Sequence, residues 1–99
     1  MTSVGVIGLG LIGQALAHRL TATGDAPLVF DVKPDAIDRA VAAGAIPTGS
    51  SAELAGRCDV VLVCVQTDAQ CVAAIRGEGG VLDGARPDTC IAVLSTVSP

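Results

Sequence analysis

Aromatic side chains are almost absent from this chain of 99 residues, which contains Phe30 but no tryptophan and no tyrosine. Hydrophobic residues nevertheless make up 51% of the sequence and charged residues only 16%, a composition that excludes a disordered chain. Alanine, valine, leucine and glycine must therefore fill the interior, which suits thin helices packed closely on a sheet. A chain of this length forms one domain, and we expect residues 1–99 to constitute it.

Basic residues are also scarce. The six lysines and arginines include a single lysine, Lys33, and the formal net charge is −4. A nucleic-acid surface or an anionic membrane surface requires clustered cations, so we expect neither nucleic acid nor membrane among the partners. The longest apolar run, Val60 to Val65, is far shorter than the roughly 20 residues of a membrane-spanning helix. Because no basic segment precedes the apolar start, we expect no targeting peptide and a cytoplasmic location.

The sequence contains no cluster typical of a metal site. Its four cysteines, at positions 58, 64, 71 and 90, include no C-x-x-C pair and have no histidine near them. We therefore predict neither zinc nor disulfides, and we interpret Cys64 and Cys90 as small buried hydrophobic residues. The single histidine, His18, falls within a predicted helix, where a surface or packing role is favoured over catalysis. We identify no catalytic residue in the chain.

Predicted strands and helices alternate along the chain. Short β-branched runs indicate strands, and apolar residues at helical spacing between capping residues and glycines indicate helices. The predicted strands cover residues 3–7, 28–32, 45–47, 59–65 and 89–94. The predicted helices cover residues 11–23, 34–43, 51–56 and 67–76, followed by a loop or short turn over 81–88. Two segments, Ser50 to Glu53 and Thr67 to Gln70, have the spacing of a capping box at the start of a helix.

This alternation predicts an α/β fold in which a parallel sheet carries helices on both faces. We predict a Rossmann-like, doubly wound sheet of five strands in the order 3-2-1-4-5. The strand order then reverses between strands 1 and 4, and ligands bind at the carboxyl ends of the strands at such a point.

A glycine-rich turn follows the first predicted strand. The residues Gly8-Leu9-Gly10-Leu11-Ile12-Gly13 match the pattern G-x-G-x-x-G between a predicted strand and a predicted helix, the context of a dinucleotide-binding turn. Gly8 allows the tight turn, Gly10 lets backbone amides approach a pyrophosphate, and Gly13 lets the helix pack closely on the sheet. The alternative is a turn that serves packing alone, and the strand–turn–helix context favours binding.

Asp31 lies near the end of the second predicted strand, 18 residues after Gly13. A carboxylate at this place accepts hydrogen bonds from the adenosine ribose and repels a 2′-phosphate, so it favours NAD over NADP. Lys33, two residues later, acts in the opposite direction because it attracts a phosphate. The alternative is that Asp31 only caps the helix that begins at Pro34.

The fourth predicted strand leads into Val65-Gln66-Thr67-Asp68. This segment lies across the reversal point from the glycine-rich turn, where the nicotinamide half of a dinucleotide would run. The alternative is that Thr67 only caps the next helix, although capping and cofactor contact can coexist.

Several further segments accompany the glycine-rich opening: VFDVKP at the second strand, Gly44-Ala45, the segment Ser51 to Ala55, and the closing Ser95 to Pro99. Together they resemble the N-terminal NAD-binding domain of the β-hydroxyacid dehydrogenase family, a domain of the 6-phosphogluconate dehydrogenase type. The family includes 3-hydroxyisobutyrate dehydrogenase and tartronate semialdehyde reductase. The resemblance implies cofactor contacts from the turn Gly8 to Gly13 and from Asp31, Val65, Gln66, Gln70 and Thr96.

The resemblance also implies a reaction, hydride transfer between NAD and the hydroxyl-bearing carbon of a small β-hydroxy acid such as 3-hydroxyisobutyrate or glycerate. In the family, a lysine beyond the first domain is the general acid/base, and a glycine-rich loop just after that domain helps to hold the substrate. Both would lie beyond Pro99 here. We therefore expect the 99 residues alone to bind NAD, to self-associate through bare apolar surface, and not to catalyse.

Two other interpretations compete with this one. The opening GLGLIG is also similar to that of prephenate dehydrogenases, although the closing segment Ser95 to Pro99 disfavours them. The second is a stand-alone nucleotide-binding module without catalysis. A structural domain that has lost cofactor binding is disfavoured by the intact glycine-rich turn and Asp31.

Overall fold

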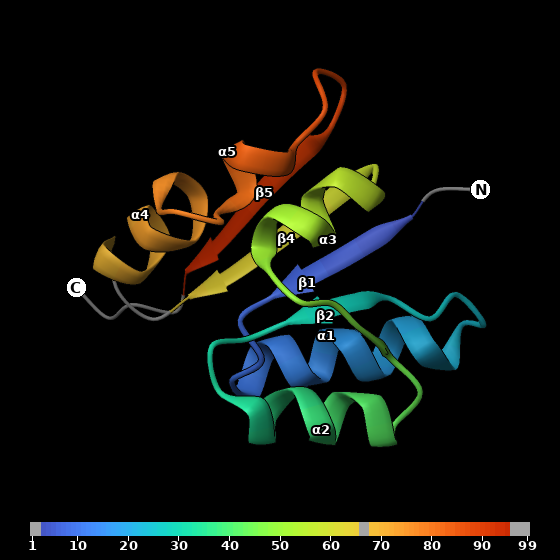
Figure 1. Ribbon diagram of the computed structural model, residues 1–99. Helices are drawn as coiled ribbons and strands as arrows, with labels where there is room; N and C mark the ends of the chain where they lie inside the picture. The colour runs from blue at the N-terminus through green and yellow to red at the C-terminus, as the bar shows by residue number, and fades with distance from the viewer. Residues whose placement is uncertain (1–2, 66–67, 96–99) are drawn as a thin grey trace.

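Five parallel strands form a single sheet in a computed structural model of the chain, which describes residues 3–65 and 68–95. The order is β3-β2-β1-β4-β5, with β1 at the centre (Figure 1). The strands are β1 (Val4–Ile7), β2 (Leu28–Phe30), β3 (Ile46–Pro47), β4 (Val60–Val65) and β5 (Cys90–Ser95). Val6 of β1 is in register with Val29 on one side and with Leu62 on the other. The predicted Rossmann-like order is confirmed.

Helices cover both faces of this sheet, as predicted. The helices are α1 (Leu11–Ala22), α2 (Pro34–Ala42), α3 (Ser51–Arg57), α4 (Asp68–Arg76) and α5 (Val81–Gly84). The first two pack on one face, and α3, α4 and α5 pack on the other (Figure 1). The short helix α5 occupies part of the segment predicted as a loop or turn. No helix within the described residues is long and apolar enough to cross a membrane.

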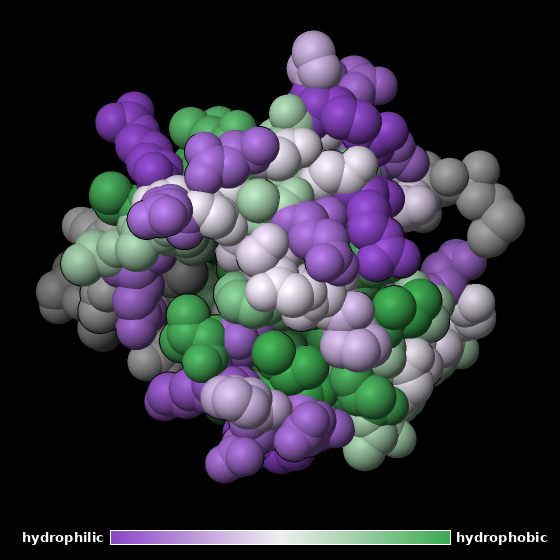
Figure 2. Space-filling view, in the orientation of Figure 1, coloured by the Kyte–Doolittle hydropathy of each residue, from purple (hydrophilic) through white to green (hydrophobic). Residues whose placement is uncertain are grey.

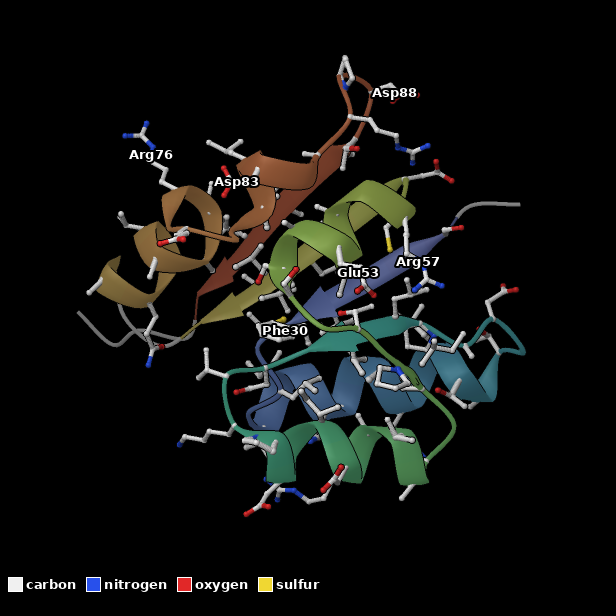
Figure 3. All side chains as sticks on the ribbon, viewed as in Figure 1. Phe30, Glu53, Arg57, Arg76, Asp83 and Asp88 are labelled. Atoms are coloured by element: carbon white, nitrogen blue, oxygen red, sulfur yellow. The ribbon has the colours of Figure 1, made fainter. Side chains whose placement is uncertain are left out.

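Each face of the sheet has its own apolar core. Under α1 and α2 the core is built mainly from small side chains, among them Val6, Val29, Ala17 and Ala40. On the other face, Leu54 of α3 is fully buried against the valines of β4. Phe30 is only partly buried and packs on this second core, at the end of β2 (Figure 3). The expected interior of alanine, valine and leucine is therefore present.

The second strand ends earlier than predicted, at Phe30 rather than at residue 32. The backbone N–H of Lys33 donates to Oδ1 of Asp31 over 2.9 Å, so the side chain turns the chain away from the sheet. Pro34 then begins α2 at a position where its missing N–H is not needed.

The serine half of the first predicted capping box is present at the start of α3. Oγ of Ser50 accepts a hydrogen bond from the N–H of Glu53 over 3.0 Å. The Glu53 carboxylate also forms an exposed ion pair with Arg57, 3.4 Å away on the next turn (Figure 3). The second predicted box begins at Thr67, outside the described residues.

The cysteines differ from expectation in one respect. Cys58 is fully buried and Cys64 is partly buried, but Cys90 is exposed. The interpretation of Cys90 as a buried residue was wrong, because β5 is an edge strand with a neighbour on one side only within the described sheet. Burial raises the pKa of the Cys58 and Cys64 thiols, so both remain protonated at neutral pH.

Several large apolar side chains remain exposed. Leu11 and Val32, next to the ends of β1 and β2, are 88% and 85% exposed, and Val93 and Leu94 of β5 are also exposed. Figure 2 shows that apolar groups are interspersed with polar ones on the face turned to the viewer. Self-association of the chain through such surface stays a prediction.

The amino ends of β1, β4 and β5 meet at a polar cluster centred on Asp59. Oδ2 of Asp59 accepts the backbone N–H of Ser3 over 3.0 Å, and Oδ1 accepts Nη2 of Arg86 over 3.1 Å. The same Arg86 nitrogen also donates to the carbonyl oxygen of Cys58 over 2.9 Å. The hydrogen bond from Ser3, and then the Arg86 guanidinium, hold the pKa of the Asp59 carboxyl below its ordinary value of 3.8.

This lowered pKa predicts a contribution to stability that depends on pH. The charged form of Asp59 is favoured in the folded chain, so its contribution is present above the ordinary pKa and is lost as the pH falls through the folded-state pKa. Urea unfolding midpoints of the unmodified chain should therefore fall between about pH 5 and pH 2, and Asp59→Asn should show a smaller fall. Equal decreases in the urea midpoints of the two proteins would contradict a pH-dependent contribution from Asp59.

Candidate functional site

The glycine-rich turn joins β1 to α1 at the carboxyl edge of the sheet. Gly8 has a φ of +90°, and a Cβ there would clash with the carbonyl oxygen of Cys64 on β4. A Cβ on Gly13 would clash with the carbonyl oxygen of Gly8. Gly8 is therefore required for the tight turn against β4, as predicted, and Gly13 is required because α1 begins directly against that turn. Gly10 differs, because it is exposed and has a φ of −74°, which any residue can adopt.

The amino end of α1 has no side-chain cap. Its N-cap residue is Gly10, and its first turn contains no acidic residue. The first amides of a helix have no acceptor within the helix, and together with the helix dipole they attract an anion. Since Gly10 has no Cβ, the backbone at this end is open to a phosphate group. The geometry of the turn is thus that of a pyrophosphate site.

Asp31 lies directly after β2, beside the glycine-rich turn. Oδ2 of its carboxylate accepts the N–H of Leu9 over 2.6 Å, and Oδ1 accepts the N–H of Lys33 over 2.9 Å. The second of these bonds is the local turn expected if Asp31 served only to lead into α2. The first bond is not local, because it joins residues 22 positions apart. Each carboxylate oxygen has a further lone pair that can accept a hydroxyl group.

A cavity of about 500 Å³ connects the turn with Asp31. It lies at the carboxyl ends of the strands, between the end of β2 and helix α4, and its volume is within the range of small-molecule sites. Its lining includes five of the predicted site residues, namely Gly8, Leu9, Gly10, Asp31 and Gln70. The structure therefore brings the predicted phosphate and ribose contacts to one cavity.

Four other predicted site residues, Leu11, Ile12, Gly13 and Val65, are not among the described lining residues. Leu11 and Ile12 are exposed in the first turn of α1, and Gly13 is buried beneath them. Val65 ends β4, next to β5. The predicted contacts of Gln66 and Thr96 lie outside the described residues and stay predictions.

The cavity also has lining residues that the sequence did not indicate. They are distributed over α2, α3, α4 and the segment after α4: Arg39, Ser50, Ser51, Ala73, Ala74, Glu78, Gly79 and Gly80. Ser50 and Ser51 follow β3 at the same edge of the sheet, so the rule that ligands bind at carboxyl ends of strands was a usable signal. Arg39 and Glu78 had no such signal, because neither belongs to a predicted motif or follows a strand directly.

The charges around the cavity are mixed. Asp31 and Glu78 are acidic, and Lys33 and Arg39 are basic. The Cys64 thiol also lines the cavity, and its raised pKa keeps it neutral. Within residues 3–65 and 68–95, no group of three or more histidines, cysteines or acidic residues could hold a metal ion. The described lining thus offers both anionic and cationic side chains to a ligand.

Residues 3–99 match the protein family described as the NAD binding domain of 6-phosphogluconate dehydrogenase. The chain belongs to this family. The resemblance inferred from the glycine-rich turn and the closing segment is confirmed. Binding of a nicotinamide dinucleotide is therefore the function of this domain type.

Two curated relatives of differing names each contain a segment similar to this chain. L-threonate dehydrogenase of Cupriavidus necator is 36% identical over 97 residues, which cover 98% of this chain and 33% of that protein. The cytokine-like nuclear factor N-PAC of Homo sapiens is 31% identical over 94 residues, which cover 95% of this chain and 17% of that protein. The chain thus spans a third or less of the length of these relatives.

Solved structures agree with the fold and the family. A 3-hydroxyisobutyrate dehydrogenase from Salmonella typhimurium has a TM-score of 0.84 at 29% identity, covering 99% of this chain and 34% of that one. A structure of Psf3 in complex with NADP+ has a TM-score of 0.83 at 28% identity, covering 97% of this chain and 34% of that one. The match to a 3-hydroxyisobutyrate dehydrogenase agrees with the hydroxyacid dehydrogenase interpretation, and the prephenate dehydrogenase alternative is not favoured.

Proposed function

We propose that this NAD-binding domain serves an oxidoreductase that transfers a hydride between NAD and a small β-hydroxy acid. The observation that carries the proposal is the uncapped end of α1, where Gly10 lines the same cavity as Asp31. The substrate class is supported by the names of two relatives, an L-threonate dehydrogenase and a 3-hydroxyisobutyrate dehydrogenase.

The residues present fit the dinucleotide. The backbone amides at the start of α1 would hold the pyrophosphate, because Gly10 leaves them uncovered. The Asp31 carboxylate would accept the hydroxyls of the adenosine ribose. The family resemblance assigns the remaining contacts to Val65, Gln66, Gln70 and Thr96, and of these Gln70 lines the cavity. When bound, the nicotinamide ring accepts or supplies the hydride.

The choice between NAD and NADP is the first point to test. Asp31 offers a charged acceptor to ribose hydroxyls, worth roughly 1.5–3 kcal/mol, and repels a 2′-phosphate. Lys33 and Arg39 line the same cavity and attract that phosphate, but neither accepts a hydrogen bond from ribose. We expect NAD to bind about tenfold or more tightly than NADP, and Asp31→Ala to reduce that ratio.

Calorimetric titration of both dinucleotides measures this ratio. Asp38→Ala is the matched control, because Asp38 is exposed on α2 and is not among the described lining residues. It removes the same charge from the same region, so it should leave the ratio unchanged. Equal or tighter binding of NADP by the unmodified chain would refute the proposed preference.

Catalysis by the 99 residues alone is not expected. Reduction of a carbonyl generates an alkoxide, which needs a positioned acid to protonate it. His18 is exposed on the body of α1, and Lys33 lies beside Asp31 at the proposed adenosine end. We expect no substrate-dependent change in NADH absorbance with 3-hydroxyisobutyrate, glycerate or tartronate semialdehyde. Measurable turnover by the purified chain would reveal a catalytic group that this proposal lacks.

A binding module without chemistry is the second candidate function. The observation in its favour is the match to a protein named as a nuclear factor rather than as a dehydrogenase. Both candidates require dinucleotide binding, so titration does not separate them. A reading frame that continues beyond Pro99 into a helical domain with the family's lysine would support the dehydrogenase.

A further inference from the structure

Two consecutive amides of the glycine-rich turn are held by the end of β2. The N–H of Gly8 donates to the carbonyl oxygen of Phe30 over 2.9 Å. The next N–H, that of Leu9, donates to the Asp31 carboxylate over 2.6 Å. The first bond extends the ladder between β1 and β2, whereas the second depends on a side chain. A single carboxylate therefore continues the ladder beyond the point where β2 turns away.

Leu9 connects its hydrogen bond with Asp31 to the proposed phosphate site, because it directly precedes Gly10 in the chain. Its side chain is 1% exposed and packs in the core beneath α1 and α2, and Gly10 follows it at the N-cap of α1. Leu9 lies between the end of β1 and the start of α1, so its N–H has no ladder or helix partner of its own. Without the carboxylate, a partly buried donor would lose its acceptor.

The other carboxylate oxygen links this point to α2. Oδ1 accepts the N–H of Lys33, the N-cap residue of α2. Helix α2 is in turn joined to α1, because Nε2 of Gln14 donates to the carbonyl oxygen of Ala36 over 2.8 Å. Asp31 thus connects the turn, the end of β2 and the first turn of α2, three segments around the same cavity.

We propose that Asp31 is a positioning residue for the pyrophosphate site, holding the glycine-rich turn in its binding geometry in addition to accepting the ribose. This inference rests on the proposed binding of a dinucleotide. It differs from the ribose role in one consequence that can be measured. Asp31 should matter for a ligand that carries the diphosphate but lacks the ribose hydroxyls.

The direction in which the affinity for such a diphosphate changes when Asp31 is replaced distinguishes positioning from ribose contact alone. Removing a negative charge near an anionic ligand should by itself tighten binding. Disturbing the turn should instead weaken it, because the amides of α1 would no longer be preorganised for the phosphates. A loss of affinity for a diphosphate without ribose hydroxyls therefore points to positioning, whereas an unchanged or improved affinity points to ribose contact alone.

The test compares ADP with 2′,3′-dideoxy-ADP on the 99-residue chain by calorimetry. Asp31→Asn has only one oxygen acceptor and so cannot serve both amides. We expect Asp31→Asn to lower the affinity for dideoxy-ADP by roughly fivefold or more, and to lower the affinity for ADP by a larger factor. Asp38→Asn, the matched loss of charge on α2, should leave both affinities unchanged or slightly improved. Dideoxy-ADP binding that is unchanged or tighter in Asp31→Asn would overturn the proposal.

A second measurement needs no ligand. Amide hydrogen exchange of Leu9, followed by NMR, should be accelerated by Asp31→Asn and not by Asp38→Asn. If the unmodified chain bound neither ADP nor NAD, the proposed function would fail, but exchange at Leu9 would still report on the bond to Asp31. If Asp31→Asn does not fold, Asp31→Glu is the alternative variant, because it retains the charge. Its longer side chain cannot reproduce both hydrogen bonds, so it should also lower the affinity for dideoxy-ADP. Normal dideoxy-ADP binding by that variant would equally refute positioning.

Discussion

Gly10→Val is expected to abolish dinucleotide binding while the domain remains folded. Gly10 is exposed, and its φ of −74° with ψ of −158° is an extended conformation that valine adopts readily. The new side chain would project in front of the first amides of α1, the place where the pyrophosphate must approach. The loss of glycine at the N-cap should cost the fold only about 1 kcal/mol.

The expected loss of NAD affinity is at least about 100-fold, or roughly 2.7 kcal/mol. Calorimetry measures the binding and circular dichroism confirms that the variant is folded. Ala15→Val is a suitable control, because Ala15 is exposed one turn further along α1 and is not among the described lining residues. If Gly10→Val bound NAD as the unmodified chain does, the turn would serve packing alone.

Gly8→Ala, unlike Gly10→Val, should greatly reduce the stability of the folded domain. The φ of +90° disfavours any side chain at this position, by about 1–2 kcal/mol. The added Cβ would also clash with the carbonyl oxygen of Cys64, which belongs to a central strand and cannot rotate away. Overpacking of this kind adds about 1–3 kcal/mol. A total of about 2–5 kcal/mol is a large share of the 5–15 kcal/mol that typically stabilises a domain.

Chemical unfolding of Gly8→Ala beside Gly24→Ala separates the two contributions. Gly24 has a similar φ of +95°, but no described atom lies within 4 Å of the position that its Cβ would take. Gly24→Ala should therefore show the conformational penalty alone, and Gly8→Ala should be less stable by the cost of the clash. Equal stabilities would show that β4 yields to the added methyl group.

Much of the fold could be predicted because its signals are local. Apolar β-branched runs such as Val60–Val65 form strands wherever they are covered on both faces, and glycine or proline marks the ends of the neighbouring helices. Right-handed crossovers then leave few possible strand orders, and the predicted order is the one observed. The proposed phosphate end of the site rests on the same kind of local pattern, since Gly8, Gly10 and Gly13 lie within one turn.

The parts that escaped prediction depend on contacts between distant segments. Helix α5 is four residues long, too short for a periodic pattern, and it packs so closely on α3 that a Cβ on Gly84 would clash with the backbone of Ala52. The exposure of Cys90 follows from the place of β5 at the sheet edge and not from the composition of the strand. Arg39 of α2 and Glu78, two residues after the end of α4, reach the cavity only because α2 and α4 approach it from opposite faces of the sheet (Figure 1).

The sequence by itself determined the alternation of strands and helices, the glycine-rich turn and the presence of a carboxylate after the second strand, because each depends on neighbouring residues. Only the tertiary structure decided what that carboxylate contacts. Asp31 and Leu9 are 22 positions apart, and their hydrogen bond exists because β1 and β2 lie side by side in parallel register. Parallel pairing brings both carboxyl ends to the same edge of the sheet, so residues far apart in the chain come to share one binding site.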